Sequence, residues 1–231
     1  DMYLFAEDVQ LADETDLHAP VELVGPEASA HLNAVVSGVD TEAAAPHSFQ
    51  LGAFGEVTTR VTRLEVAGRP GWRLETEPSQ VAALWAALTE AGATPGGLVA
   101  FDSLRAENLS AAVGREITDE IYPQEARLDD AFSLTKGCYI GQEVVAKIDT
   151  YGGLNKQLFR LRVSHDEPVA PGTRLVREVG GEHRDLGVVT SWAYSFATDS
   201  GVVLGYVKRK HQEPGTEFRL GDTSATAVLE E

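Results

Sequence analysis

Apolar and polar residues alternate along several stretches of the first part of the chain, a pattern typical of β-strands with one buried face. It predicts a strand from Tyr3 to Gln10 and another over Val21–Val24. The alternation returns from Ser48 to Thr76, where it predicts the remaining strands of a sheet.

Three segments have the helical period instead. The first follows Pro26, which suits a first helical position, and ends at Gly38, which suits a C-cap. The second runs from Ser79, its predicted cap, to Ala91. Its apolar residues recur at i, i+3, i+4 and i+7 and predict a buried stripe made of Val81, Leu84, Trp85 and Leu88. A third helix is predicted to be capped by Asp102, with Leu104 and Leu109 facing inward.

From Gln157 onward the helical period is absent, and short alternating runs are separated by turns that contain glycine. They predict six strands, at Leu158–Val163, Thr173–Val179, Leu186–Ser191, Val202–Val207, Glu217–Leu220 and Thr226–Leu229. Short strands with regular turn signals favour a small antiparallel barrel.

Strands and helices mixed in the first part, followed by strands alone, predict an α+β fold with helices on one face of a sheet, ferredoxin-like in arrangement. We place the division between an α+β domain at residues 1–155 and a C-terminal β-barrel domain at residues 156–231.

Composition narrows the possible partners. The formal charge is −17, so the average surface repels nucleic acid and anionic membranes, and we expect neither as a direct partner. The basic run Lys208–His211 is interpreted as a solvated strand end. No apolar run approaches the roughly twenty residues of a membrane span, and nothing at the start resembles a signal peptide, so we expect a cytoplasmic protein.

The single cysteine excludes an internal disulfide and fits a reducing compartment. It also excludes a cluster held by four thiolates of one chain. The six histidines are scattered without ligand-like spacing, so we expect no metal site.

The cysteine lies in the segment Lys136–Glu143, between two glycines. On an extended backbone Lys136 and Cys138 would project to the same side. A helix is predicted directly downstream, over Gln142–Ile148. A nearby cation and a helix N-terminus both favour the thiolate form, which is the reactive one. The alternative is that Cys138 is a small buried hydrophobe, as most free cysteines are.

The order Lys-Gly-Cys-Tyr-x-Gly-Gln-Glu over residues 136–143 resembles the signature of the YgfZ-type folate-binding proteins, relatives of the glycine-cleavage T-protein, an aminomethyltransferase. The resemblance extends over nearly the whole chain. It includes an Asp-x-Leu-Arg-x-Glu element at Asp102–Glu107, a Pro-x-Glu-Ala element at Pro123–Ala126 and a Gly-x-Val-Thr-Ser strand at Gly187–Ser191.

The resemblance implies a T-protein-type folate-binding domain followed by a small barrel, with the N-terminal part of the family fold missing from this chain. It also implies a tetrahydrofolate-binding protein that supports iron–sulfur cluster assembly or repair, with client enzymes or assembly proteins as partners. Lys136 and Cys138 would be the catalytic residues. The folate-binding residues would be Arg105, Glu107, Tyr139, Gln142 and Glu143. For Arg105 and Glu107 an ion pair with the helix or a loop is the structural alternative.

Two departures argue against aminomethyl transfer. Where the aminomethyltransferase branch has a Gly-Glu-Asp-Gly turn, this chain has Gly68-Arg69-Pro70-Gly71. Phe101 stands where that branch has an arginine.

The preferred hypothesis is therefore a folate-dependent accessory protein in iron–sulfur enzyme maintenance. Cys138 could bond a cluster iron, exchange thiols or trap a one-carbon unit, and the sequence does not choose among these roles. A transferase that uses tetrahydrofolate and an interaction module with an inert cysteine are the alternatives.

Overall fold

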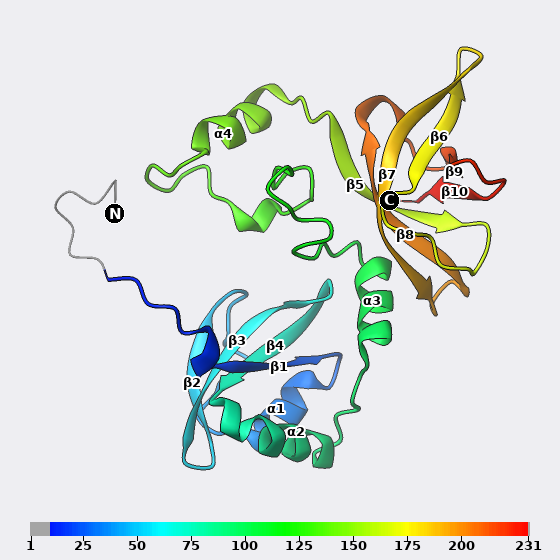
Figure 1. Cartoon of the computed structure of the whole chain (residues 1–231). Helices are drawn as coiled ribbons and strands as arrows, with labels where there is room; N and C mark the ends of the chain where they lie inside the picture. The colour runs from blue at the N-terminus through cyan, green and yellow to red at the C-terminus, as the bar shows by residue number, and fades with distance from the viewer. Residues whose placement is uncertain (1–9, 231) are drawn as a thin grey trace. The chain divides into compact units, whose positions relative to one another are not determined.

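The computed structural model describes residues 10–230, and the chain divides into two compact units, Asp1–Pro95 and Gly96–Glu231 (Figure 1). The strand predicted from Tyr3 to Gln10 lies outside the described residues except for its last position. The predicted domain boundary after residue 155 stays a prediction. The compact units divide earlier because helix α3, at the start of the second unit, packs on barrel strands β7 and β8.

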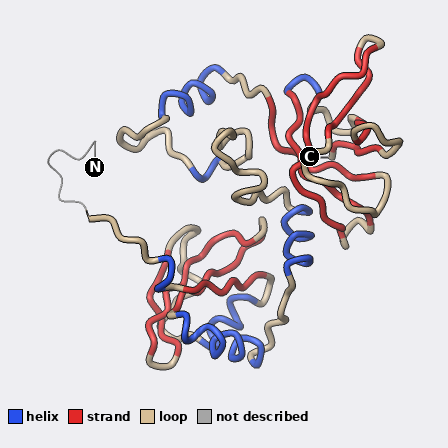
Figure 2. The backbone as a smooth tube through the Cα atoms, viewed as in Figure 1, coloured by secondary structure: helices blue, strands red, loops and turns tan. Residues whose placement is uncertain are grey.

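The first unit is a four-stranded antiparallel sheet with two helices (Figures 1 and 2). Its strand order is β1-β4-β3-β2. In chain order the elements are η1 (Thr15–Leu17), β1 (Ala19–Val24), α1 (Ala28–Val35), β2 (Phe49–Phe54), β3 (Val57–Val66), β4 (Arg69–Thr76), η2 (Pro78–Gln80) and α2 (Val81–Glu90). Apart from the strand predicted from Tyr3 to Gln10, the strands and helices predicted for this unit are confirmed.

One face of this sheet is buried under the helices, as the alternation requires. Val21 and Leu23 of β1 are paired with Leu74 and Trp72 of β4, and all four join one core with Leu32 of α1. Because every second strand residue points to this face, the apolar pattern sets which side of the sheet the helices cover.

Two details predicted for helix α2 are wrong. Trp85 is 45% exposed and not part of the core, whereas Leu84 and Leu88 are buried. Adjacent helical residues diverge by about 100°, so the narrow stripe that includes Leu84 turns Trp85 away from the sheet. Ser79 does not cap the helix, because the chain enters it through the 3₁₀ turn η2, and the N-cap Gln80 makes no side-chain capping bond.

The second unit contains the closed six-stranded antiparallel barrel predicted for the end of the chain, with strand order β10-β5-β8-β7-β6-β9 (Figure 1). The elements before the barrel are α3 (Leu98–Glu107), η3 (Asp129–Ala131) and α4 (Gln142–Tyr151). The barrel and its one short helix comprise β5 (Lys156–Val163), β6 (Arg174–Val179), β7 (Glu182–Ser195), β8 (Ser200–Lys208), η4 (Arg209–His211), β9 (Glu217–Leu220) and β10 (Thr226–Leu229).

Every barrel strand contributes apolar side chains to a common interior. Leu161, Leu175, Val203, Phe218 and Leu229 are all nearly inaccessible to solvent. Phe218 is the largest of the fully buried side chains, and it comes from β9, only four residues long. A short strand is held in place here because its apolar residues point into the barrel.

Helix α3 differs from its prediction. It begins at Leu98 after Gly97, so Asp102 lies within the helix and not at its cap. There the Asp102 carboxylate accepts a hydrogen bond from Arg115, 2.8 Å away. No helix among the described residues is both long enough and apolar enough to cross a bilayer.

Candidate functional site around Cys138

The segment Lys136–Glu143 leads into helix α4, and its glycine at position 141 determines how the helix starts. Gly141 is the N-cap and has a φ of 88°, in the left-handed region that glycine adopts at little cost. Its carbonyl accepts the first helical hydrogen bonds, from the amides of Val144 and Val145. The predicted helix over Gln142–Ile148 is confirmed and continues to Tyr151.

The sulfur of Cys138 is exposed. The alternative in which this residue is a buried hydrophobe is therefore wrong. Cys138 precedes the first residue of α4 by four positions, on the side of the helix where the macrodipole is positive.

Lys136 does not take the position that an extended backbone would give it. The chain bends over residues 134–137, and the Ser133 hydroxyl accepts hydrogen bonds from the amides of Thr135 and Lys136. The Lys136 ammonium lies 4.7 Å from the centre of the Tyr139 ring, in a cation–π contact. The cation thus lies beside the ring of a residue three positions further on, and its predicted activation of the Cys138 sulfur stays a prediction.

Gln142 and Glu143 occupy the first turn of α4. The Gln142 side-chain oxygen accepts a hydrogen bond from the Tyr139 amide at 3.0 Å, which closes the turn that follows the cysteine. Glu143 is exposed, and a carboxylate in the first turn is favourable because of the helix dipole. Gln142 therefore stabilises the bend, while the carboxylate of Glu143 and the exposed part of Tyr139 remain accessible.

Gln124 holds α4 in place, a role that our sequence analysis missed. Its side chain, in a residue only 8% exposed, donates a hydrogen bond to the Val145 carbonyl at 3.0 Å. The main-chain carbonyl of Gln124 accepts a hydrogen bond from the Gln157 side chain on β5. Gln124 lies inside the Pro123–Ala126 element, so a signal was present, but the sequence does not show which element the amide contacts.

Arg105 is in a buried network and not in an open site. Its guanidinium donates to a Glu116 carboxylate oxygen at 2.7 Å, to the Ser191 hydroxyl at 2.9 Å and to the Ser110 carbonyl at 3.0 Å. Glu116 also accepts bonds from the Ser191 hydroxyl and the Ala112 amide. The Arg105 side chain is 3% exposed and that of Glu116 is 0% exposed.

Glu107 is likewise engaged by the barrel. Its carboxylate accepts hydrogen bonds from the Ser195 hydroxyl at 2.8 Å and the Ala197 amide at 3.0 Å, beyond the end of β7. Its main-chain carbonyl accepts a bond from Arg160 on β5.

Arg105 and Glu107 thus make structural contacts between α3 and the barrel, which favours the structural alternative, and the folate contacts predicted for them stay a prediction. A ligand carboxylate could reach Arg105 only by displacing a buried glutamate. The sequence spacing left this open because Glu116 and Ser191 are 11 and 86 positions away from Arg105. For Tyr139, Gln142 and Glu143 folate contact stays a prediction.

Tyr206 closes the network from the barrel side. Its hydroxyl donates to the Glu116 carbonyl at 2.8 Å. Burial, followed by the negative charges of Glu116 and Glu125, raises the pKa of the Tyr206 hydroxyl far above its usual value. The phenol is thus neutral and acts as a donor throughout the physiological range.

Comparison with known families identifies the class of protein. The model of the GCVT N-terminal domain matches residues 2–136, and that of the glycine cleavage T-protein C-terminal barrel domain matches residues 156–227. The chain belongs to the glycine cleavage T-protein (GcvT) family.

Individual relatives agree with this assignment. The chain is 32% identical over 219 residues to an aminomethyltransferase of Symbiobacterium thermophilum, and 33% identical over 207 residues to one of Rubrobacter xylanophilus. These alignments cover 92% and 87% of this chain but 57% and 52% of the relatives. The chain thus spans little more than half the length of these curated relatives.

A solved structure shares the fold. The crystal structure of the glycine cleavage system aminomethyltransferase T from Bartonella henselae matches with a TM-score of 0.64 at 16% sequence identity. The match covers 93% of this chain and 83% of that one. The expected T-protein-type fold with a C-terminal barrel is thereby confirmed.

Proposed function

We propose that this chain is a tetrahydrofolate-binding member of the family, of the YgfZ type, that supports assembly or repair of iron–sulfur clusters in client enzymes. Cys138 is its reactive group, and Lys136 is the cation that activates the thiol. Tetrahydrofolate supplies one-carbon chemistry when bound. The iron–sulfur cluster is the substrate of the repair and resides in the client enzyme.

The exposed thiol of Cys138 at the entrance to α4 is the observation that carries this proposal. A free cysteine that contributes only packing is expected to be buried. This one lies on the surface, after a hydrogen-bonded bend and before a glycine with a left-handed backbone. Such an arrangement presents a sulfur to a partner and contributes little to a core.

The side chains around Cys138 fit a folate only in part. Tyr139 offers a ring, and Glu143 offers a carboxylate that could accept from the amino group and ring N–H of a pterin. Arg105 does not fit the glutamate tail of a folate, because its guanidinium is buried against Glu116. Any cation that holds this tail must therefore be another residue.

Complementation tests the proposal. In a strain that lacks the full-length protein, Cys138→Ala should abolish restoration of iron–sulfur enzyme activity. Ile140→Ala is the matched control, because Ile140 is 94% exposed in the same segment and occupies the variable position of the signature. It should restore activity fully, and both variants should be folded, since neither changes a core residue. Full restoration by Cys138→Ala would refute the proposal.

Aminomethyl transfer is the second candidate, because both curated relatives described above are named aminomethyltransferase. The full-length protein would then release a one-carbon unit to tetrahydrofolate from an aminomethyl donor. An in vitro assay of methylenetetrahydrofolate formation separates the candidates. Turnover that survives Cys138→Ala would favour the transferase, and no turnover would favour the accessory role.

A further inference from the structure

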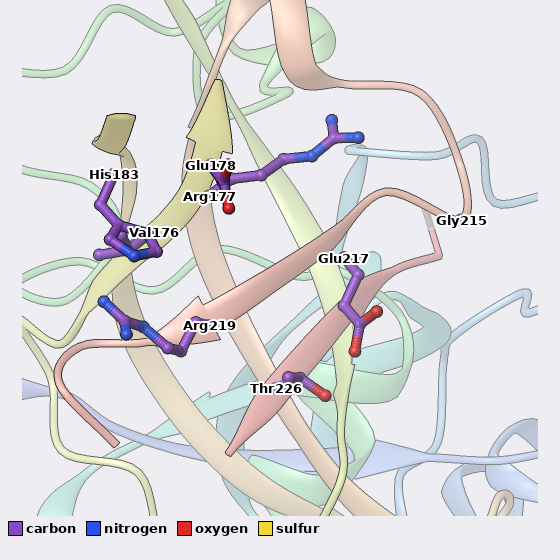
Figure 3. Close-up of a pocket in the computed structure, with 8 residues that line it drawn as sticks. All are labelled: Val176, Arg177, Glu178, His183, Gly215, Glu217, Arg219 and Thr226. Carbon is purple, nitrogen blue, oxygen red and sulfur yellow. The ribbon is translucent and has the colours of Figure 1, made fainter. Parts of the chain in front are cut away.

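The outer face of the barrel carries an open pocket of about 540 Å³, which lies apart from the segment around Cys138 in the sequence (Figure 3). It arises where strands β6 and β9 separate. These strands pair only through Leu175 with Leu220 and Val176 with Arg219. Beyond Val176, strand β6 continues paired with β7 alone, and β9 pairs with β10. The space between the separating strands is the pocket.

Strand register brings the polar residues of the pocket onto one face. Arg219 on β9 is paired with Val176 on one side and with Thr226 of β10 on the other. His183 of β7 is paired with Glu178 of β6. Directly paired residues point to the same face of a sheet, so these side chains surround a common space. The pocket volume is within the range of small-ligand sites.

Arg219 lines the pocket and makes no hydrogen bond or ion pair with the described residues. Its Nε is buried and makes no hydrogen bond within the structure. Figure 3 shows its guanidinium directed toward the His183 ring, with Val176 beside them. Because Nε is covered, an oxyanion in the pocket would meet the guanidinium at its terminal nitrogens, which offer a pair of charged N–H donors.

Charges around the pocket limit the kind of anion. Arg177 and Arg219 line it together with Glu178 and Glu217, so these four side chains carry no net charge. Among the described residues, none of the four forms an ion pair. Figure 3 shows the Glu217 carboxylate on the Thr226 side, away from the guanidinium of Arg219. The guanidinium of Arg219 balances the charge of a single oxyanion, whereas the carboxylates of Glu178 and Glu217 would repel the additional charges of a polyanion.

Several cations lie near His211, among them the pocket residue Arg177. Burial, followed by the positive charges of Arg177, Lys210, Arg184 and Lys208, lowers the pKa of the nearby His211.

We propose that this pocket is a binding site for a small molecule with a single carboxylate or phosphate group, held by the guanidinium of Arg219 with His183 as second donor. It lies outside the segment proposed to be reactive and is independent of the function proposed above.

Titration of the isotope-labelled full chain with inorganic phosphate, and separately with acetate, tests this at constant ionic strength. The Nε–H resonance of Arg219 and the ring protons of His183 are followed by NMR. Saturable shifts of both, with a dissociation constant of about millimolar order for such small probes, are expected for at least one anion. The anion that saturates identifies the group as phosphate or carboxylate.

Arg219→Lys retains the charge but removes the planar pair of donors, so it should weaken binding by about tenfold or more. Arg69→Lys is the matched control, because Arg69 is an exposed arginine on β4 in the other unit, and binding should be unchanged. His183→Gln, which should weaken binding several-fold, is the second variant should Arg219→Lys not fold. Shifts that do not saturate with either anion, or affinity unaffected by the Arg219 and His183 changes, would overturn the proposal.

Discussion

Replacing Arg105 with methionine should be among the most destabilising single changes in the second unit. Three of its four acceptors, on Glu116, Ser191 and Ser110, lie within 3.0 Å, and the fourth, on Asp102, lies 3.5 Å away. The change leaves the fully buried Glu116 carboxylate with only the Ser191 hydroxyl and the Ala112 amide as donors. Removal of one member of a buried ion pair costs about 3–5 kcal/mol, a large part of the roughly 5–15 kcal/mol stability of a typical domain.

A second change separates loss of charge compensation from loss of packing. Glu116→Gln in the Arg105→Met background removes the uncompensated charge but keeps the shape of the side chain. It should recover most of the loss and leave about 1–2 kcal/mol for the missing hydrogen bonds. Arg105→Lys should be intermediate, because an ammonium keeps the charge but cannot reach all of these acceptors in the geometry of a guanidinium.

Urea unfolding followed by fluorine NMR of fluorotryptophan-labelled protein provides the assay. The chain has three tryptophans, of which Trp192 reports on the second unit, while Trp72 and Trp85 report on the first. The midpoint at Trp192 should fall in Arg105→Met. The reasoning is refuted if this variant loses less than about 1 kcal/mol, or if the double variant is no more stable than the single one.

Three further changes test other contacts. Gly141→Ala should cost about 1 kcal/mol and speed amide exchange in α4, because its φ is 88°, whereas Gly137→Ala should be neutral, since no atom lies within 4 Å of the added Cβ. Because the pKa of the Tyr206 hydroxyl is raised in the folded state, the unfolded chain loses the hydroxyl proton more readily. The contribution of the protonated hydroxyl to folding stability is therefore present below about pH 10 and is lost as the pH rises further. The stability difference between the wild type and Tyr206→Phe should therefore shrink between pH 8 and 11 in urea titrations. Leu84→Ala should cost about 2–5 kcal/mol and Trp85→Ala less than about 1 kcal/mol in the same measurement, and equal costs would contradict the assigned burial.

Much of the fold was predictable because burial within an element follows a local period. Alternation predicted the strands of both sheets, and turn residues predicted their boundaries. The same reasoning was wrong at Trp85, because a stripe at helical spacing does not say how wide the buried face is. It was also wrong at Asp102, since a residue that suits a helix cap is equally able to bind an arginine of a nearby loop from within the helix.

The candidate site was predictable only as a segment. The order of residues 136–143 located the cysteine, the glycine before α4 and the helix itself. It did not place the Lys136 ammonium, which contacts the Tyr139 ring because the backbone bends at Ser133.

By itself, then, the sequence determined where strands and helices form, that the chain ends in a barrel, and that its one thiol precedes a helix. Only the tertiary structure decided that Arg105 and Glu107 serve the barrel, that Gln124 anchors α4, and that Arg219 lines a pocket. The physical reason is that local periodicity encodes which face of an element is apolar. The partner of a polar side chain depends instead on chain segments that are distant in sequence and meet only when the barrel closes.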